Sequence, residues 1–262
     1  MLKKAEDRLG RVIEYQYPPK KIVSICPGIT ETLFALQLEN EMKGITRYCI
    51  LPEDKVKAVT KVGGTKQIKE EVIHEIKPDL IIAEKEENTK EIVESLEKDF
   101  PVYVADVQSI SDAYEMMLEL GELTDRKEQA DNLVAQIKGQ FAKIPQVQAK
   151  RAAYVIWKKP YMVVGKDTYI QSVLERMGLI NPFTNLNGRY PVITEEDFQK
   201  ADLDYVFLAS EPYPFKQQHQ AEFTAMMPNV KAVNIEGEMF WYGSHMLSAA
   251  NYFKNLVESL EG

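Results

Sequence analysis

Short apolar runs alternate with helical spacing over the first hundred residues. Residues 21–26 form a β-branched run that ends at Pro27-Gly28, and apolar runs recur at 80–83 and 102–104. Between the runs, apolar residues lie three and four positions apart, as from Leu33 to Leu38, which is the spacing of an amphipathic helix. Strands that alternate with helices predict a parallel sheet covered by helices on both faces.

The pattern changes at residue 109, after which only helical spacing is found until Ala152. Gly121 and Thr124-Asp125 divide this stretch, so we expect a short helix followed by a longer one over residues 126–143. The longer helix has one apolar face, and its roughly 18 residues would span about 27 Å, the width of a small lobe. We therefore expect it to act as a rigid spacer.

Strand and helix patterns return in the last part of the chain. Glu71 and Asp79 are matched 125 residues later by Glu196 and Asp204, each pair leading into an apolar run. We predict an α/β fold of two Rossmann-like lobes joined by one long α-helix, with a cleft between the lobes. The expected boundaries are 1–108 for the N-terminal lobe, 109–145 for the connecting helical segment and 146–262 for the C-terminal lobe.

The composition is that of a folded protein, since 45% of the 262 residues are hydrophobic and 27% are charged. The 32 Lys and Arg against 40 Asp and Glu give a net charge of −8, which argues against nucleic acid as a partner. No apolar run approaches the ~18–20 residues that span a bilayer, and residues 1–10 do not form a secretory signal. Either the protein is cytoplasmic, with Met1 as its natural start, or it is periplasmic or membrane-associated and a signal has been removed.

Motifs for catalysis are scarce. The chain has no complete phosphate loop, no dinucleotide-binding glycine motif, no Gly-x-Ser-x-Gly and no His-Glu-x-x-His. His245 follows the aromatic run 240–242, so it is either a metal or ligand contact or the first turn of the last helix. Cys26 and Cys49 lie at the ends of two neighbouring strands; a disulfide and two reduced thiols would both fit, and the thiols are favoured. We predict no enzyme activity and no intrinsic cofactor, and we assign no metal ligands.

Large rings and basic side chains gather just after the predicted strands, where open α/β sheets bind ligands. Both tryptophans of the chain are among them. Rings at loop tips suit a broad, flat ligand, and interleaved Arg and Lys suit carboxylates, phosphates or other anionic groups. The candidates on this ground are Arg47, Tyr48, Lys85, Trp157, Lys158, Tyr161, Tyr213, Trp241 and Tyr242.

Four segments occur in the order found in a known family. They are residues 22–33 (IVSICPGITETL), 44–46 (GIT), 62–65 (VGGT) and 77–83 (KPDLIIA). On these segments the chain resembles the class III, helical-backbone solute-binding proteins of ABC importers, and most of all their cobalamin-binding branch. The resemblance implies the class III periplasmic-binding-protein fold and a shallow inter-lobe cleft that binds cobalamin, haem or a ferric siderophore.

The resemblance also implies roles for single residues. It places a cleft tyrosine at Tyr48 and the docking glutamates for a permease at Glu71 and Glu196; alternatively, these glutamates are only favourable charges at helix N-termini. Thr65 and Lys85 stand where the cobalamin receptors carry tryptophans, which favours an anionic chelate or a propionate-bearing ring. The rings expected near the ligand are Trp157, Tyr161, Tyr190, Trp241 and Tyr242, and the cations expected at its periphery are Arg47, Lys85, Lys158 and Arg189.

We predict a monomeric solute-binding protein whose ligand is a small metal-containing or metal-chelating molecule and whose partner is an ABC permease. Cobalamin, haem and ferric siderophores are the candidate ligands, held non-covalently between rings of both lobes. The alternative is a cytoplasmic enzyme or metallochaperone for a tetrapyrrole or metal chelate, with His245, Cys49 and the acids of residues 84–87 as ligands or acid–base groups. A third candidate is a sensor or interaction module that docks a partner through Glu71 and Glu196.

Overall fold

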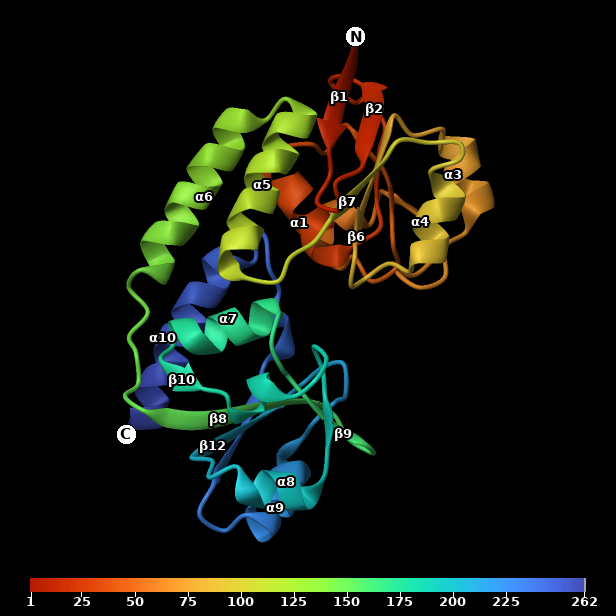
Figure 1. The fold of residues 1–262 in the computed structure, drawn as a ribbon. Helices are drawn as coiled ribbons and strands as arrows, with labels where there is room; N and C mark the ends of the chain where they lie inside the picture. The colour runs from red at the N-terminus through yellow and green to blue at the C-terminus, as the bar shows by residue number, and fades with distance from the viewer. Residues whose placement is uncertain (262) are drawn as a thin grey trace. The chain divides into compact units, whose positions relative to one another are not determined.

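The computed structural model describes residues 1–261, and the chain forms two compact units, each with its own sheet (Figure 1). No helix in this described part of the chain is both long and apolar enough to cross a membrane. Unit 1 consists of Met1–Val107, Ser111–Lys138 and Tyr242–His245, and unit 2 consists of Gln108–Ile110, Gly139–Trp241 and the chain from Met246 onward.

Unit 1 is built on a parallel sheet. Its strands are β3 (Ile22–Ser24), β4 (Met42–Ile45), β5 (Thr60–Lys61), β6 (Leu80–Glu84) and β7 (Val102–Ala105). They lie in the order β5-β4-β3-β6-β7, and every neighbouring pair is parallel. All residues of β6 are buried, because helices cover both faces of the sheet and leave no face for water.

Helices lie on both faces of this sheet, so the predicted α/β fold class is confirmed for unit 1. The helices are α1 (Pro27–Ala35), α2 (Glu53–Val56), α3 (Glu70–Ile76), α4 (Lys90–Leu96) and α5 (Ile110–Thr124). α3 and α4 lie side by side on one face, where Ser95 Oγ donates to Glu70 at 3.0 Å, and α1 and α5 lie on the other (Figure 1). The apolar side chains under α3 and α4 pack against Val23 and Ile81 of the sheet.

An N-terminal hairpin precedes the sheet and is not predicted by the sequence pattern. Its strands are β1 (Leu2–Glu6) and β2 (Val12–Gln16), which pair antiparallel. The buried carboxylate of Asp7 holds the turn, since it accepts from the Leu9 and Arg11 amides at 2.9 Å and pairs with the Arg11 guanidinium at 2.7 Å. The turn is therefore stabilised by Asp7 and Arg11, two charged residues between the strands.

The sequence predicts a short first connecting helix, and this prediction is wrong. α5 and α6 (Lys127–Phe141) have 15 residues each, and they run side by side (Figure 1). Gly121 does not break α5; a Cβ at this position would lie 2.5 Å from Ala130 Cβ, so the glycine allows α6 to approach α5 closely. The chain passes from unit 1 to unit 2 within α6, between Lys138 and Gly139.

Unit 2 contains a mixed sheet in the order β11-β9-β8-β12-β13, with β10 also paired to β8. β8, β12 and β13 are mutually parallel, whereas β9 and β11 are antiparallel additions at one edge. The second half is therefore not a simple copy of the first. The strands are β8 (Lys150–Trp157), β9 (Tyr161–Val163), β10 (Leu179–Ile180), β11 (Val192–Ile193), β12 (Tyr205–Ala209) and β13 (Lys231–Ile235).

Four α-helices and two 3-10 turns complete the described part of unit 2. They are α7 (Tyr169–Arg176), η1 (Pro182–Asn185), α8 (Glu195–Lys200), α9 (Gln217–Met226), η2 (Gly237–Phe240) and α10 (Met246–Glu261). α8 and α9 lie side by side (Figure 1), joined by the edge-on rings of Phe198 and Phe223 at 5.5 Å. His219 of α9 is buried, although its neighbours in the sequence are polar. At the start of the helix, its Nδ1 accepts from the Lys216 amide at 2.8 Å.

Candidate functional site

Because the five strands of the large sheet of unit 1 are parallel, their carboxyl ends share one edge of the sheet, and the residues that follow them form a common surface. We call this edge, made by residues 26, 46–49, 62–66, 84–88 and 106, the carboxyl edge. Asn88 ties three of its segments together, since its Nδ2 donates to Ile25 O and Thr65 O at 3.0 Å and its Oδ1 accepts from Glu84 N at 2.9 Å. Ligands of open α/β folds bind at such edges.

Arg47 and Tyr48 form an exposed pair on the carboxyl edge. The Arg47 guanidinium lies 4.9 Å from the Tyr48 ring centroid, and its Nη2 donates to the Tyr48 hydroxyl at 3.0 Å. The Tyr48 side chain remains 49% exposed. A Cβ at Gly64 would lie 3.1 Å from the Tyr48 ring, so this glycine gives the pair its room. The two predicted ligand residues are thus brought together and accessible.

Lys85 is also on the carboxyl edge, but its charge is paired. Its Nζ lies 2.6 Å from Asp106 Oδ2, and the Asp106 carboxylate is largely buried beside it. The expectation that Lys85 makes this edge basic therefore lacks support from the local geometry, because a neighbouring acid offsets the charge.

Glu84 and Glu87 are carboxylates of this edge that the sequence indicates only for the alternative enzyme or metallochaperone, not for the solute-binding protein. Glu84 is the last residue of β6 and is buried, and it accepts from the amides of Glu86, Glu87 and Val107 at 2.7, 3.0 and 3.3 Å. Burial raises the pKa of the Glu84 carboxyl to about 7, although these amides act in the opposite direction. The signal in the sequence was a run of acids directly after a buried strand.

Glu87 is half-buried, although it lies in a run of charged residues. Burial raises the pKa of the Glu87 carboxyl, while Lys66 and a hydrogen bond from the Thr65 hydroxyl oppose this shift. Cys26 and Tyr242 contact each other on the same edge, with Cys26 Sγ 3.4 Å from the Tyr242 hydroxyl. Burial raises the pKa of both groups well above their ordinary values, and the negative charges of Glu84 and Glu87 add to the shift.

The segment Tyr242–His245 belongs to unit 1 and packs on α1. Gly243 has φ +92°, and a Cβ there would lie 2.3 Å from Thr32 Oγ1. Thr32 Oγ1 accepts from the Ser244 amide at 3.0 Å. His245 is 8% exposed at its side chain, and its Nδ1 lies 3.1 Å from the Glu31 carboxylate. The structure therefore gives His245 a carboxylate partner on α1.

The two cysteines are free and buried, which agrees with the thiol alternative. Cys49 Sγ lies 3.2 Å from the hydroxyls of both Thr30 and Thr46. No group of three or more His, Cys, Asp or Glu side chains within the described residues is arranged to hold a metal ion.

In unit 2, the rings predicted to meet a ligand divide into exposed and packed ones. Trp157, at the end of β8, is 40% exposed and lies edge-on to Tyr213 at 5.6 Å. Tyr161 packs edge-on against Phe198 and Phe223, so much of its ring belongs to the core. Trp241 donates its indole N–H to the Glu211 carboxylate.

Of the cations predicted in unit 2, Lys158 is held by a local ion pair with Glu222 of α9. Arg189, followed by Tyr190, lies just before β11, and its carbonyl accepts from the Gly165 amide at 2.8 Å. Both Arg189 and Tyr190 are half-buried.

The two predicted docking glutamates lie in corresponding places, one in each unit. Glu71 is in the first turn of α3 and Glu196 in the first turn of α8, and both are exposed. Glu196 pairs with Lys200 at 2.5 Å on the surface, while Asp197, not Glu196, completes the capping box of α8.

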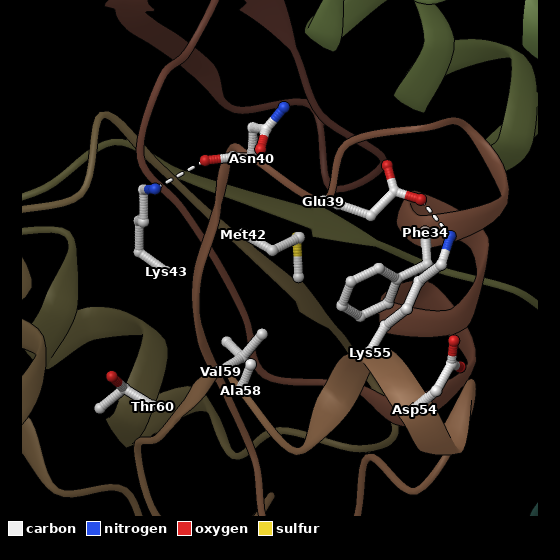
Figure 2. A pocket seen from close by; sticks show the side chains of 10 residues that line it. All are labelled: Phe34, Glu39, Asn40, Met42, Lys43, Asp54, Lys55, Ala58, Val59 and Thr60. Carbon is white, nitrogen blue, oxygen red and sulfur yellow. Dashed lines mark hydrogen bonds and ion pairs between the residues drawn. The ribbon is translucent and has the colours of Figure 1, made fainter.

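A pocket of about 470 Å³ in unit 1 lies at the other edge of the sheet, where β4 and β5 begin. Figure 2 shows Lys55 reaching to Glu39, and Lys43 to the Asn40 carbonyl, around an apolar floor that includes Met42. None of the predicted ligand residues lines it.

Two α/β units with rings and charges on the loops after their strands are typical of a binding protein for a small solute. The family model described as periplasmic binding protein matches residues 22–233. The chain belongs to this family, whose members serve as the solute-binding components of ABC importers, and both the resemblance and the fold class predicted from the sequence are confirmed.

Two relatives and one solved structure illustrate the similarity. The substrate-binding lipoprotein YvrC of an ABC transporter from Bacillus subtilis is 29% identical over 215 residues, 77% of this chain and 67% of the relative. A vitamin B12-binding protein of Vibrio vulnificus is 26% identical over 184 residues, 68% of this chain and 67% of the relative. A possible iron-binding periplasmic protein of Staphylococcus epidermidis shares the fold, with a TM-score of 0.79, 22% identity and coverage of 94% of this chain and all of the other.

Proposed function

We propose that the ligand of this solute-binding protein is a metal-containing macrocycle of the corrinoid type, with haem and ferric siderophores as the competing candidates. The exposed Arg47–Tyr48 pair on the carboxyl edge carries the proposal, because it offers a flat ring and a cation where open α/β sheets bind ligands. The similarity to vitamin B12-binding proteins supports the corrinoid among the three candidates.

The proposed ligand residues are given for each unit by itself. In unit 1 they are Arg47, Tyr48 and Lys85, with Tyr242 and His245 on the segment that packs on α1. In unit 2 the exposed ring of Trp157 and its neighbour Tyr213 offer the best stacking surface. The remaining members of the proposed set are Lys158, Tyr161, Arg189, Tyr190 and Trp241.

The same proposal covers partners and location. The protein acts outside the cytoplasmic membrane, as a periplasmic or membrane-associated monomer, and delivers its ligand to a permease through Glu71 and Glu196. The three-part organisation (1–108, 109–145 and 146–262) fits this role. The metal arrives as part of the cargo, so the protein needs no cofactor of its own and performs no catalysis.

Tryptophan fluorescence tests the ligand, because Trp157 and Trp241 are the only tryptophans. Titration with cyanocobalamin, haemin and a ferric siderophore should give saturable quenching by cyanocobalamin at micromolar concentration or below. Trp157→Phe and Trp241→Phe separate the two signals, and Trp157→Ala should weaken binding about tenfold if its ring stacks on the ligand. Quenching by haemin or the siderophore alone would replace the corrinoid, and no quenching by any of them would refute the proposed ligand class.

A further inference from the structure

His219 is buried in the first turn of α9, where it holds the beginning of the helix through two hydrogen bonds with one residue. Its Nδ1 accepts from the Lys216 amide at 2.8 Å, and its own amide donates to the Lys216 carbonyl at 2.8 Å. In an ordinary capping box, the side chain that accepts from the N-cap amide is a Glu or Gln. Here the acceptor is a ring nitrogen, so the same bond that begins α9 also fixes where the imidazole ring lies.

The imidazole ring belongs to a chain of aromatic contacts that ends at a proposed ligand residue. Tyr213 lies edge-on to His219, with the ring centroids 5.6 Å apart, and edge-on to Trp157, also at 5.6 Å. Phe215 packs against His219 at 5.4 Å and against Tyr213 at 4.6 Å. Tyr213 therefore lies between a buried ring and the exposed ring of Trp157, and edge-on pairs favour one relative orientation of their rings.

The same helix also holds the residue that follows Trp157. The Lys158 ammonium forms an ion pair with the carboxylate of Glu222, three positions after His219 in α9, and the Lys158 side chain is largely buried. Residues three apart in a helix lie on the same face. A displacement of the first turn of α9 would therefore disturb the contacts of Trp157 and Lys158 together.

We propose that His219 is a positioning residue for ligand binding. Its hydrogen bond with Lys216 and its ring contact with Tyr213 together hold the Trp157 ring in the orientation that stacks on the ligand. His219 acts through Tyr213 and does not itself touch the ligand. The proposal rests on the proposed function, in which Trp157 is a ligand residue. A ring that is held in advance loses little freedom on binding, so its positioning is measured as affinity.

Two variants separate the hydrogen bond from the ring contact. His219→Phe keeps a ring beside Tyr213 and removes the acceptor, whereas His219→Asn keeps an acceptor near the place of Nδ1 and removes the ring. Each should weaken the binding of cyanocobalamin by about fivefold, measured by calorimetry, because each removes one of the two contacts that position Trp157. Circular dichroism checks that both variants are folded.

A double-mutant cycle with Trp157→Ala distinguishes positioning from a general loss of structure. If His219 acts through Trp157, His219→Phe should change the affinity by less than about twofold in the Trp157→Ala background. The fluorescence of Trp157 gives a second measurement, made without ligand in the Trp241→Phe background. Its emission should shift to longer wavelength in both His219 variants, because the ring is then held less firmly and is more exposed to water.

Thr168→Ala is the matched control for the loss of a helix cap. Thr168 Oγ1 accepts from the Gln171 amide at 3.0 Å at the start of α7, which carries none of the proposed ligand residues. This variant should be less stable in urea and should keep its affinity within about twofold. Unchanged affinity in either His219 variant, or a loss that persists in the Trp157→Ala background, would overturn the role of His219 while the proposed function stands. Failure of the wild-type protein to bind cyanocobalamin would refute the proposed corrinoid ligand, and the role of His219 with it.

Discussion

At the scale of single residues, burial and hydrogen bonds act against each other on Glu84. Three backbone amides stabilise its charged form, yet burial prevails and raises the pKa from its ordinary value of 4.5 to about 7. The folded protein therefore binds this proton more tightly than the unfolded chain. The stability that this difference contributes is fully present below pH 4.5 and is lost as the pH rises to about 7.

Glu84→Gln should remove this pH dependence. The difference in unfolding free energy between wild type and variant should change by up to about 3 kcal/mol between pH 4.5 and 8, with the wild type losing more stability as the pH rises. The variant should also be less stable at low pH, because its amide nitrogen faces a backbone N–H. Urea unfolding at several pH values measures both effects, and parallel profiles of the two proteins would contradict the assignment.

Gly243 is a second residue whose role follows from geometry. It combines φ +92° with a site where a Cβ would lie 2.3 Å from Thr32 Oγ1 and 3.0 Å from the Gly28 carbonyl. Gly243→Ala should destabilise the protein by about 2–3 kcal/mol in urea unfolding. Gly188→Ala is the matched control, since Gly188 has φ +89° but open space around its Cα. If Gly243→Ala and Gly188→Ala lose the same unfolding free energy, the segment Tyr242–His245 is not tightly packed on α1.

At the scale of elements, two glycines of the connecting helices should respond in opposite ways to alanine. Gly121→Ala should cost about 2 kcal/mol or more, because the new Cβ would meet Ala130 Cβ at 2.5 Å and force α5 and α6 apart. Gly139→Ala lies in α6 with nothing within 4 Å, so it should stabilise the protein by up to about 1 kcal/mol through helix propensity. Thermal and urea unfolding of both variants measure these effects. If both variants lose a similar amount of unfolding free energy, the close approach of α5 and α6 does not explain the role of Gly121.

The sequence predicts best the helices and strands whose apolar residues follow one clear pattern. The strand at 80–83 is recognised because both faces of β6 are buried and its first four residues are all apolar. Gly121 is misread as a helix break because glycine lowers helix propensity, and its actual use depends on a neighbour nine positions later in α6. The N-terminal hairpin escapes prediction because Asp7 and Arg11 stabilise its turn through local hydrogen bonds and an ion pair, which leave no periodic signal.

At the scale of the whole molecule, the candidate site is only partly predictable. Spacing locates the loops after the strands, and it therefore finds Tyr48, Lys85 and Trp157. Spacing cannot show that Asp106 neutralises Lys85, since the two residues come from different strands and meet only in the folded sheet. For the same reason Glu87 reads as one acid in a solvated run, whereas the fold half-buries it.

The proposed docking role of Glu71 and Glu196 leads to a prediction about the intact protein and a permease. Glu71 and Glu196 are exposed in the first turns of α3 and α8, at positions related by the 125-residue repeat. If Glu71 and Glu196 dock the permease as proposed, Glu71→Lys and Glu196→Lys should leave the ligand affinity within about twofold. Each should lower ligand uptake through the importer, reconstituted in liposomes, by about tenfold or more, because a reversed charge would oppose the proposed contact.

Glu94→Lys on α4 is the control, since it reverses an exposed charge of unit 1 at a site with no proposed partner. If the two glutamates serve only as favourable charges at helix N-termini, each reversal should instead lower the unfolding free energy by about 0.3–1 kcal/mol and leave uptake intact. Stability and uptake measured on the same variants therefore separate a docking role from a local one, and the double variant shows whether both units must engage the permease at once.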